Sequence, residues 1–307
     1  MSFRGAVKSR LQSRSSALIV ALLINALPNF VSAKSIDVVD DSGNTVHLAR
    51  PAQRIISLAP SLTELAFAAG AGDALVGVVE YSDFPEAATR IPVIGRFDHF
   101  DLELILALEP DIVLAWQTGN PRATIEALER LGIEVYIAEP KTLESIPEQL
   151  RKIGQLAGTE TAAENSALIF EQRLTELAAR YRDRSPVRVF YQVWDRPLMT
   201  VGGAELTHDL IQLCGGENVF GELSALAPKV NLEAILLRDP EIIIASGIDE
   251  RRPPWLDSWS QWPSISAVKN AQLTFVDPDL TQRHSPRVLQ GAEIICRKIE
   301  QARQRLN

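Results

Sequence analysis

The chain has 307 residues, of which 46% are hydrophobic and 23% are charged, and its formal net charge at pH 7 is −8. This composition excludes an intrinsically disordered protein, and the length is enough for more than one domain. The acidic balance argues against a nucleic-acid-binding protein and against attachment to an anionic membrane surface.

The first 33 residues predict a secretory signal peptide. Four basic residues and no acidic ones occur there, and the basic residues precede the apolar run ALIVALLINAL and the small-x-small sequence VSA. This order is that of a cleaved leader, and the apolar run is too short to span a bilayer comfortably. An uncleaved anchor is the alternative. Removal of the leader takes the net charge of the mature chain to −12.

After a small hairpin at 36–49, apolar runs typical of buried strands alternate with helical segments. Asp101 is the expected N-cap of one of these helices and Pro110 its expected stop. Such alternation predicts a parallel sheet with crossover helices. The strands are expected at 54–60, 74–79, 111–116 and 135–140, and the helices at 61–72, 101–110, 124–132 and 145–158.

A long polar helix without glycine or proline is expected at about 160–183, and it would extend about 35 Å. The alternation then restarts. We therefore predict an α/β fold of two Rossmann-like lobes, each with a central parallel sheet, joined by one long rigid α-helix. The N-terminal lobe is expected at 34–158, the linking helix at 159–184 and the C-terminal lobe at 185–307. The strands of the second lobe are expected at 187–194, 241–246 and 273–278, and its helices at 205–216, 231–240 and from about Ser285.

An internal repeat indicates that the two lobes are related. Residues 101–115, DLELILALEPDIVLA, align without gaps on residues 231–245, NLEAILLRDPEIIIA. The repeat places Glu103 and Glu233 at equivalent helix starts, where each carboxylate favours the helix N-terminus. A cleft between related lobes is a usual place for a small ligand.

Catalytic motifs are missing from the sequence. It contains no G-x-G-x-x-G, no P-loop and no G-x-S-x-G, and VGGAE at 201–205 is better explained by a turn than by a phosphate site. The four histidines are scattered and lack metal-ligand spacing. We therefore predict a binding protein rather than an enzyme, with no catalytic residue, no cofactor and no metal site.

The candidate ligand site lies at the expected strand ends, where open α/β sheets bind ligands. Aromatic rings there suit a large, flat, partly apolar ligand, although each ring can instead cap the core. Three other tryptophans, Trp255, Trp259 and Trp262, have the spacing of a buried helical stripe. The candidates are Ser61, Tyr81, Phe97, Trp116 and Trp194, with Asp279, Leu280, Thr281, Gln282 and Arg283 on the last loop.

Two cysteines, Cys214 and Cys296, lie far apart and form no C-x-x-C motif. In an oxidising compartment such a pair suggests one structural disulfide. Two buried free thiols are the alternative.

Several segments resemble the periplasmic cobalamin-binding proteins of cobalamin ABC importers, which are substrate-binding proteins with a helical backbone. The segments are RIISLAPSLTELAFAAGAGDALVGVVEYSDFPEAA, IPVIGRFDHFDLELILALEPDIVLAWQTGN and CGGENVF. RIISLAPSLTE is shared with haem- and siderophore-binding relatives, whereas EYSDFP and LAWQTGN are more particular to the cobalamin group. The resemblance covers essentially the whole mature chain and implies two α/β lobes joined by a rigid helix.

This resemblance implies a monomeric periplasmic protein that captures cobalamin or a related corrinoid and delivers it to the permease dimer of an inner-membrane ABC importer. Cobalamin would be the transported ligand rather than a cofactor. A haem- or iron-siderophore-binding function is the alternative, with Tyr81 or His284 as an iron ligand. A sensory or signalling function of the same two-lobe protein is the third possibility.

The resemblance also implies residue roles. Tyr81 and Trp116 match aromatic pocket residues, and Phe97 stands where close relatives in the family have tryptophan. Within the ligand-contacting loop 279–283, Arg283 is retained. Leu280 and Thr281 replace aromatics there, and Ala227 also lacks an aromatic counterpart.

Two further pairs follow from the resemblance. Cys214 and Cys296 match a disulfide of the family. Glu103 and Glu233 match the glutamates that dock on arginines of the two membrane subunits.

Overall fold

The computed structural model describes residues 35–246 and 251–306, which belong to one compact unit, Lys34–Asn307. The predicted signal peptide lies outside the described residues. None of the helices in these two ranges has the length and apolarity that a membrane crossing requires.

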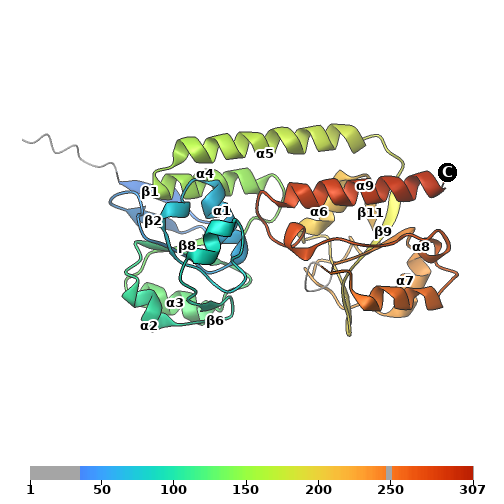
Figure 1. Cartoon of the computed structure of the whole chain (residues 1–307), viewed down its shortest axis with the longest axis horizontal. Helices are drawn as coiled ribbons and strands as arrows, with labels where there is room; N and C mark the ends of the chain where they lie inside the picture. Colours follow the sequence, from blue (N-terminus) through green and yellow to red (C-terminus); the bar gives the residue numbers. More distant parts are fainter. Residues whose placement is uncertain (1–34, 247–250, 307) are drawn as a thin grey trace, which may run out of the picture. The chain divides into compact units, whose positions relative to one another are not determined.

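The first lobe is built on a parallel sheet with the strand order β4-β3-β7-β8. Figure 1 labels β8, the edge strand of this sheet. Both faces of the sheet are buried, as its apolar runs predict. Along β7, Ile112 and Leu114 join one core cluster, and Val113 and Ala115 join another on the opposite face. The strands are β3 (Ile55–Ser57), β4 (Leu75–Gly77), β7 (Ile112–Trp116) and β8 (Val135–Ala138). The helices are α1 (Pro60–Ala68), α2 (Leu102–Ala107), α3 (Arg122–Arg130) and α4 (Ser145–Ala157).

Smaller elements complete this lobe. The expected hairpin is present, and the carboxylate of Asp40 closes its turn by accepting from the backbone of Ser42 and Asn44, each at 2.9 Å. The elements are β1 (Ile36–Val39), β2 (Thr45–Leu48), β5 (Gly95–Arg96), β6 (His99–Phe100) and the short 3₁₀ helices η1 (Gly72–Ala74) and η2 (Glu86–Arg90).

The second lobe has a sheet of order β10-β9-β12-β13, in which β11 also pairs with β9. Its strands are parallel except for β10. The sequence patterns did not indicate the short strands β10 and β11. The strands are β9 (Val187–Asp195), β10 (Leu198–Thr200), β11 (Gly216–Asn218), β12 (Ile242–Ala245) and β13 (Leu273–Phe275). The helices are α6 (Leu206–Leu213), α7 (Leu232–Arg238), η3 (Pro254–Gln261), α8 (Ser266–Lys269), η4 (Pro278–Leu280) and α9 (Val288–Leu306).

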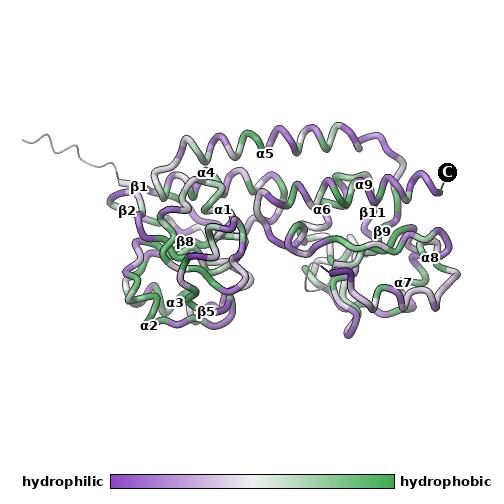
Figure 2. The backbone as a smooth tube through the Cα atoms, in the orientation of Figure 1, coloured by the Kyte–Doolittle hydropathy of each residue, from purple (hydrophilic) through white to green (hydrophobic). Residues whose placement is uncertain are grey.

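The long helix α5 (Glu160–Tyr181) joins the two sheets, as predicted. It packs on α4 and α1 and then on α6 and α9. Ala163 and Phe170 of its buried side belong to the same core cluster as residues of both sheets. Figure 2 shows hydrophilic stretches over much of α5 and hydrophobic ones around β8. One apolar layer therefore continues beneath α5 from the first lobe into the second.

The internal repeat is confirmed at the level of local structure. Asp101 caps α2 by accepting from the backbone N–H of Leu104 at 3.0 Å. Asn231 caps α7 in the same way, accepting from Ala234 at 2.8 Å. Equivalent positions in the two lobes thus satisfy free N–H groups of the first helical turn.

The predicted tryptophan stripe is wrong in part. The segment forms the 3₁₀ helix η3, which has about three residues per turn, so a spacing of four places Trp255 and Trp259 on different faces. Trp262 lies just beyond the end of this helix. Trp259 is buried, and its indole N–H donates to Oε1 of Gln192 at 2.7 Å. Trp255 is only half-buried, and Trp262 is 37% exposed.

The predicted disulfide is confirmed. Cys214 at the end of α6 is bonded to Cys296 in α9, and both residues are fully buried. The bridge closes a loop across a sequence separation of 82 residues. It therefore ties the first helix of the second lobe to its last.

We expect the double substitution Cys214→Ala and Cys296→Ala to lower the free energy of unfolding by up to roughly 4 kcal/mol, because the unfolded chain regains the freedom of a long loop. Urea unfolding of both proteins under non-reducing conditions measures the difference. Reduction should shift the midpoint of the wild-type protein and leave that of the double variant unchanged. A loss below about 1 kcal/mol would contradict a stabilising role for the bridge.

Candidate functional site

Two adjoining cavities lie where the carboxyl ends of the central strands of the two lobes come together. Their volumes are about 330 and 510 Å³, and we call them the first and second compartments of the cleft. They share the side chains of Trp116, Val193, Gln282 and His284. Ala138 at the end of β8 and Trp194 near the end of β9 line the first compartment. This is the location that parallel sheets favour for a ligand.

Trp116 ends β7 and lines both compartments. Its backbone N–H donates to Oδ1 of Asn120 at 2.6 Å, and the amide of Asn120 donates to the carbonyls of Leu58 and Phe97, both at 2.9 Å. A Cβ on Gly119 would lie only 1.8 Å from Cε3 of the indole ring. The sequence W-Q-T-G-N therefore fixes the ring against a glycine that leaves it room.

The other predicted site residues before the last loop fall into two groups. Ser61 and Trp194 line the first compartment, and the indole N–H of Trp194 donates to the carbonyl of Arg196 at 3.2 Å. Tyr81 and Phe97 are 72% and 42% exposed and do not line either compartment. Contact between the ligand and these two rings therefore stays a prediction.

The predicted site residues of the last loop, 279–283, also fall into two groups. Asp279, Gln282 and Arg283 line the first compartment, whereas Leu280 and Thr281 line neither. Thr281 is fully buried, and its hydroxyl lies 2.8 Å from that of Tyr191. This threonine secures the loop to β9 and leaves its neighbours to face the cleft.

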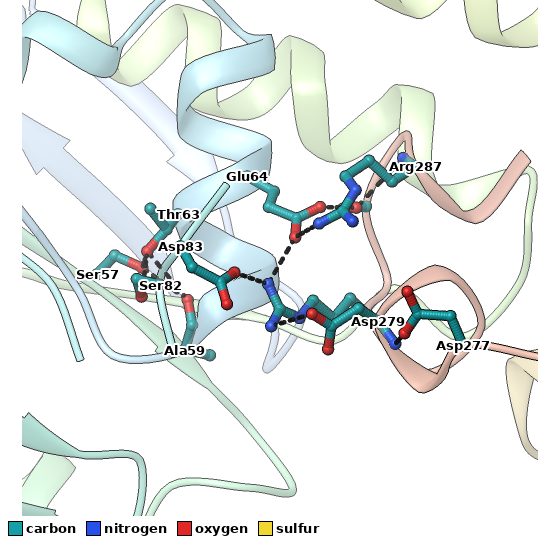
Figure 3. Close-up of polar contacts among 11 residues, drawn as sticks. Ser57, Ala59, Thr63, Glu64, Ser82, Asp83, Asp277, Asp279 and Arg287 are labelled. Atoms are coloured by element: carbon teal, nitrogen blue, oxygen red, sulfur yellow. Dashed lines mark hydrogen bonds and ion pairs between the residues drawn. The ribbon is translucent and has the colours of Figure 1, made fainter. Parts of the chain in front are cut away.

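Arg283 lies in a cluster of charges at the edge of the first compartment. Figure 3 labels three carboxylates of this cluster, those of Glu64, Asp83 and Asp279. The Nη1 atom of Arg283 is 3.0 Å from Glu64 and 2.7 Å from Asp83, and its Nη2 atom is 2.7 Å from Asp279. Burial opposes the charge of the guanidinium, but Asp83, Asp279 and Glu64 raise the pKa of Arg283. The positive charge is thus satisfied by three carboxylates.

Glu64 was not among the candidates from sequence. It lies in α1 and is only 3% exposed. Burial raises the pKa of its carboxyl group, against the hydrogen bond from Ser285 and the charges of Arg287 and Arg283. The one signal in the sequence was an acidic residue inside the apolar run SLTELAFAA.

His284 lines both compartments. Its Nδ1 atom is 2.8 Å from the carbonyl of Pro140, and its Nε2 atom is 3.4 Å from Oε1 of Glu205. Burial disfavours its charge, but the Glu205 carboxylate and the Pro140 carbonyl outweigh it and raise the pKa of His284. Glu205 also accepts from the backbone of Thr207 at 2.6 Å and so caps α6.

The second compartment has an apolar wall with polar groups at intervals. Val193, Val201, Leu226 and Ala227 form the wall. Glu139 lies at its edge, where it accepts from the hydroxyl of Thr118 at 2.9 Å. Within the two described ranges, no three acidic, histidine or cysteine side chains gather in an arrangement that could hold a metal ion. The lining suits a ligand with apolar faces and hydrogen-bonding edges.

Comparisons with known proteins agree with this geometry. A family model of periplasmic binding proteins matches residues 55–280. The vitamin B12-binding protein of Vibrio vulnificus (strain CMCP6) is 37% identical over 262 residues, which cover 83% of this chain and 94% of the relative. That of Yersinia pestis (strain Pestoides F) is 36% identical over 255 residues, with coverage of 82% and 88%.

Solved structures of periplasmic binding proteins are also similar to this chain. The periplasmic vitamin B12 binding protein BtuF of Vibrio cholerae superposes with a TM-score of 0.75 at 34% identity, covering 82% of this chain and 98% of that one. The periplasmic heme-binding protein RhuT from Roseiflexus sp. RS-1 has a TM-score of 0.71 at 20% identity, covering 82% and 99%. At that identity the second comparison shows a shared fold alone. The two-lobe α/β fold predicted from sequence is thereby confirmed.

Asp209 is a titratable residue in the first turn of α6, the helix that Glu205 caps. Burial is the main cause that raises its pKa to about 6, and the charges of Glu144 and Glu205 add to this. A backbone hydrogen bond from Leu143 and the charge of His284 act in the opposite direction. The folded protein therefore holds a proton on Asp209 that the unfolded chain releases between about pH 4 and pH 6.

We expect this proton to make stability fall as pH rises through that window, because the folded state binds more protons there. Asp209→Asn removes the titration, so the unfolding free energy of the variant relative to wild type should rise by about 1 kcal/mol from pH 4 to pH 7, after an allowance for the partial exposure of the group. Urea unfolding at several pH values measures this difference. A difference independent of pH would contradict the raised pKa.

Proposed function

The chain belongs to the periplasmic binding protein family, and from that premise we propose that it captures cobalamin or a closely related corrinoid and delivers it to the membrane subunits of an ABC importer. The observation that carries the proposal is the cleft between the two lobes, in which Trp116 forms a wall of both compartments. The relatives named as vitamin B12-binding proteins support the choice of ligand.

A corrinoid combines apolar ring faces with a rim of uncharged amide side chains. The rings of Trp116 and Trp194 offer apolar area to the faces, and full burial of one such ring contributes about 1.5–3 kcal/mol. Gln282 can donate to and accept from the amides, while the carboxylates of Glu139 and Glu205 can accept from them. Several such contacts are needed to exceed the entropic cost of association.

A haem-binding function is less well supported by the positions of the residues that would ligate iron. His284 has Pro140 and Glu205 as partners of its two ring nitrogens. Tyr81 is exposed and lies outside the lining of the cleft. Neither side chain presents a free ligand atom to the two compartments.

The remaining features of the proposal concern location and chemistry. The first 33 residues direct export to the periplasm and are then removed, and the mature chain acts as a monomer. It binds its ligand without changing it and holds no cofactor of its own. Membership in a family of periplasmic binding proteins supports the periplasmic location and the role in binding.

We further propose that Glu103 and Glu233 dock on the two subunits of the permease. Both side chains are exposed, and each lies in the first turn of its helix, away from the lining of the cleft. Each has an exposed leucine one turn further along the same face, Leu106 in α2 and Leu237 in α7. The two carboxylates are at equivalent positions of the repeat, and an exposed apolar side chain beside each of them suits a two-sided interface.

Titration of the purified mature protein with cobalamin should show stoichiometric binding, which calorimetry and the shift of the corrin absorption bands both measure. Haem should bind more weakly or not at all. Tight haem binding in the absence of any signal from cobalamin would reverse the assignment of the ligand.

Within this experiment, Trp116→Ala should weaken cobalamin binding by about 1–3 kcal/mol, because an aromatic wall is lost from both compartments. Trp262→Ala is the matched control, since it removes a tryptophan that lines neither compartment. The control should bind as the wild type does. Equal affinities for the two variants would assign Trp116 to packing alone.

The docking glutamates are tested separately from ligand binding. Glu103→Ala and Glu233→Ala should leave cobalamin affinity unchanged but each weaken association with the reconstituted transporter by about 2–5 kcal/mol, as loss of one partner from an interfacial charge pair does. Glu129→Ala in α3 removes another exposed helical carboxylate and is the control. Normal association and uptake by the double variant would refute docking through these residues.

A further inference from the structure

The carboxylate of Glu64 is buried at a point where the two lobes touch. It lies in α1 of the first lobe, yet its three hydrogen-bond donors all belong to one segment of the second lobe. Nη1 of Arg283 lies at 3.0 Å, Oγ of Ser285 at 2.5 Å and Nη1 of Arg287 at 2.9 Å. Figure 3 labels Glu64 and, of the donors, Arg287. More than 200 residues of sequence separate acceptor and donors.

The same segment, residues 283–287, has further contacts with the first lobe. Arg283 reaches Asp83 at 2.7 Å, and the guanidinium of Arg287 lies 4.1 Å from the centre of the Phe84 ring. His284 contacts the carbonyl of Pro140 at 2.8 Å. Four of the five residues of the segment are thus held by α1, by the loop after β4 and by the loop after β8.

The first-lobe side of this contact is itself held together. The hydroxyl of Thr63, next to Glu64, lies 2.9 Å from that of Ser57 at the end of β3 and 3.0 Å from that of Ser82 (Figure 3). These bonds join α1 to the loop that carries Asp83. Glu64 and Asp83 therefore keep a constant spacing, which the guanidinium of Arg283 spans.

Separation of the lobes at this point would be costly. Glu64 would lose every donor that the structure gives its carboxylate, and Arg283 would keep only Asp279 of its three acidic partners. A buried charge that loses its partners is strongly destabilising, unlike the loss of an exposed ion pair. The contact thus opposes any movement that opens the cleft along this edge.

We propose that Glu64 is a positioning residue that holds the two lobes in their ligand-binding arrangement and keeps Arg283 at the edge of the first compartment. The helix α5 joins the lobes along one side, and the contact of Glu64 with residues 283–287 joins them a second time, next to the cleft. The cleft is then formed before the ligand arrives. The consequence for affinity rests on the proposed function, whereas the consequence for lobe geometry does not.

Pulsed electron–electron double resonance tests the proposal by measuring the distance between spin labels on Glu129→Cys and Lys269→Cys. These exposed positions lie in α3 and α8, which belong to different lobes. With the native Glu64 we expect one narrow distance distribution that cobalamin does not shift. Glu64→Gln keeps the shape of the side chain but leaves two guanidinium groups facing a neutral amide. Its distribution should be broader without ligand and should narrow when cobalamin is added.

The affinity of Glu64→Gln for cobalamin should fall on the order of tenfold, because only a fraction of the molecules then has the binding arrangement. The control is Glu241→Gln, which removes a partly buried carboxylate that pairs with Arg188 inside the second lobe. It should lower thermal stability and leave both the distances and the affinity as in wild type.

Unchanged distances in Glu64→Gln would overturn the proposal, whatever its thermal stability. If that variant does not fold, Ser285→Ala and Arg287→Met each remove one donor and are measured in the same way; wild-type distributions in both would overturn it equally. Failure of the wild-type protein to bind cobalamin would refute the proposed ligand, and the distance measurements would still decide the role of Glu64.

Discussion

The burial of both faces of each parallel sheet determines where a ligand can bind. Alternate residues of β7 and of β12 belong to cores on opposite sides of their sheets, so neither face is open. What remains accessible is the edge at the carboxyl ends of the strands, and Trp116 stands there as the last residue of β7. Its ring lies against Gly119 and its backbone is held by Asn120. A large aromatic side chain at a strand end is therefore supported from behind and serves as a wall.

The two lobes are joined by interactions of different kinds. Beneath α5 an apolar core continues from one sheet to the other, and this contact is extensive and without direction. Near the cleft the contact is polar, with Glu64 accepting from Arg283, Ser285 and Arg287. The apolar layer gives cohesion, whereas the hydrogen bonds specify distance and angle. Within the second lobe the disulfide between Cys214 and Cys296 links α6 to α9, the helix that directly follows the loop that makes these bonds.

The parts of the structure that depend on local pattern could be predicted from sequence. Periodicity identified the main strands and helices of both lobes but not the short strands β10 and β11, and the repeat identified the equivalent caps Asp101 and Asn231. What could not be predicted depends on partners far away in sequence. Thr281 is directed into the core by Tyr191, and Glu64 is satisfied by residues more than 200 positions later. Spacing also misled where the backbone was not α-helical, because the helix that carries Trp255 and Trp259 is a 3₁₀ helix and ends before Trp262.

The charges around the cleft bear on the kind of ligand it can select. Arg283 is the guanidinium that lines the first compartment, and the carboxylates of Glu64, Asp83 and Asp279 lie within 3.0 Å of it. An anionic ligand would have to compete with these three groups and would strand a buried carboxylate if it displaced Glu64. An uncharged ligand meets no such cost, because it can use the aromatic walls and form hydrogen bonds without disturbing the ion pairs. Selectivity then depends on shape and on neutral donors and acceptors, which is the chemistry that the amide-bearing rim of a corrinoid presents. The contact that positions the lobes therefore also engages the guanidinium through which the first compartment could otherwise accept an anion.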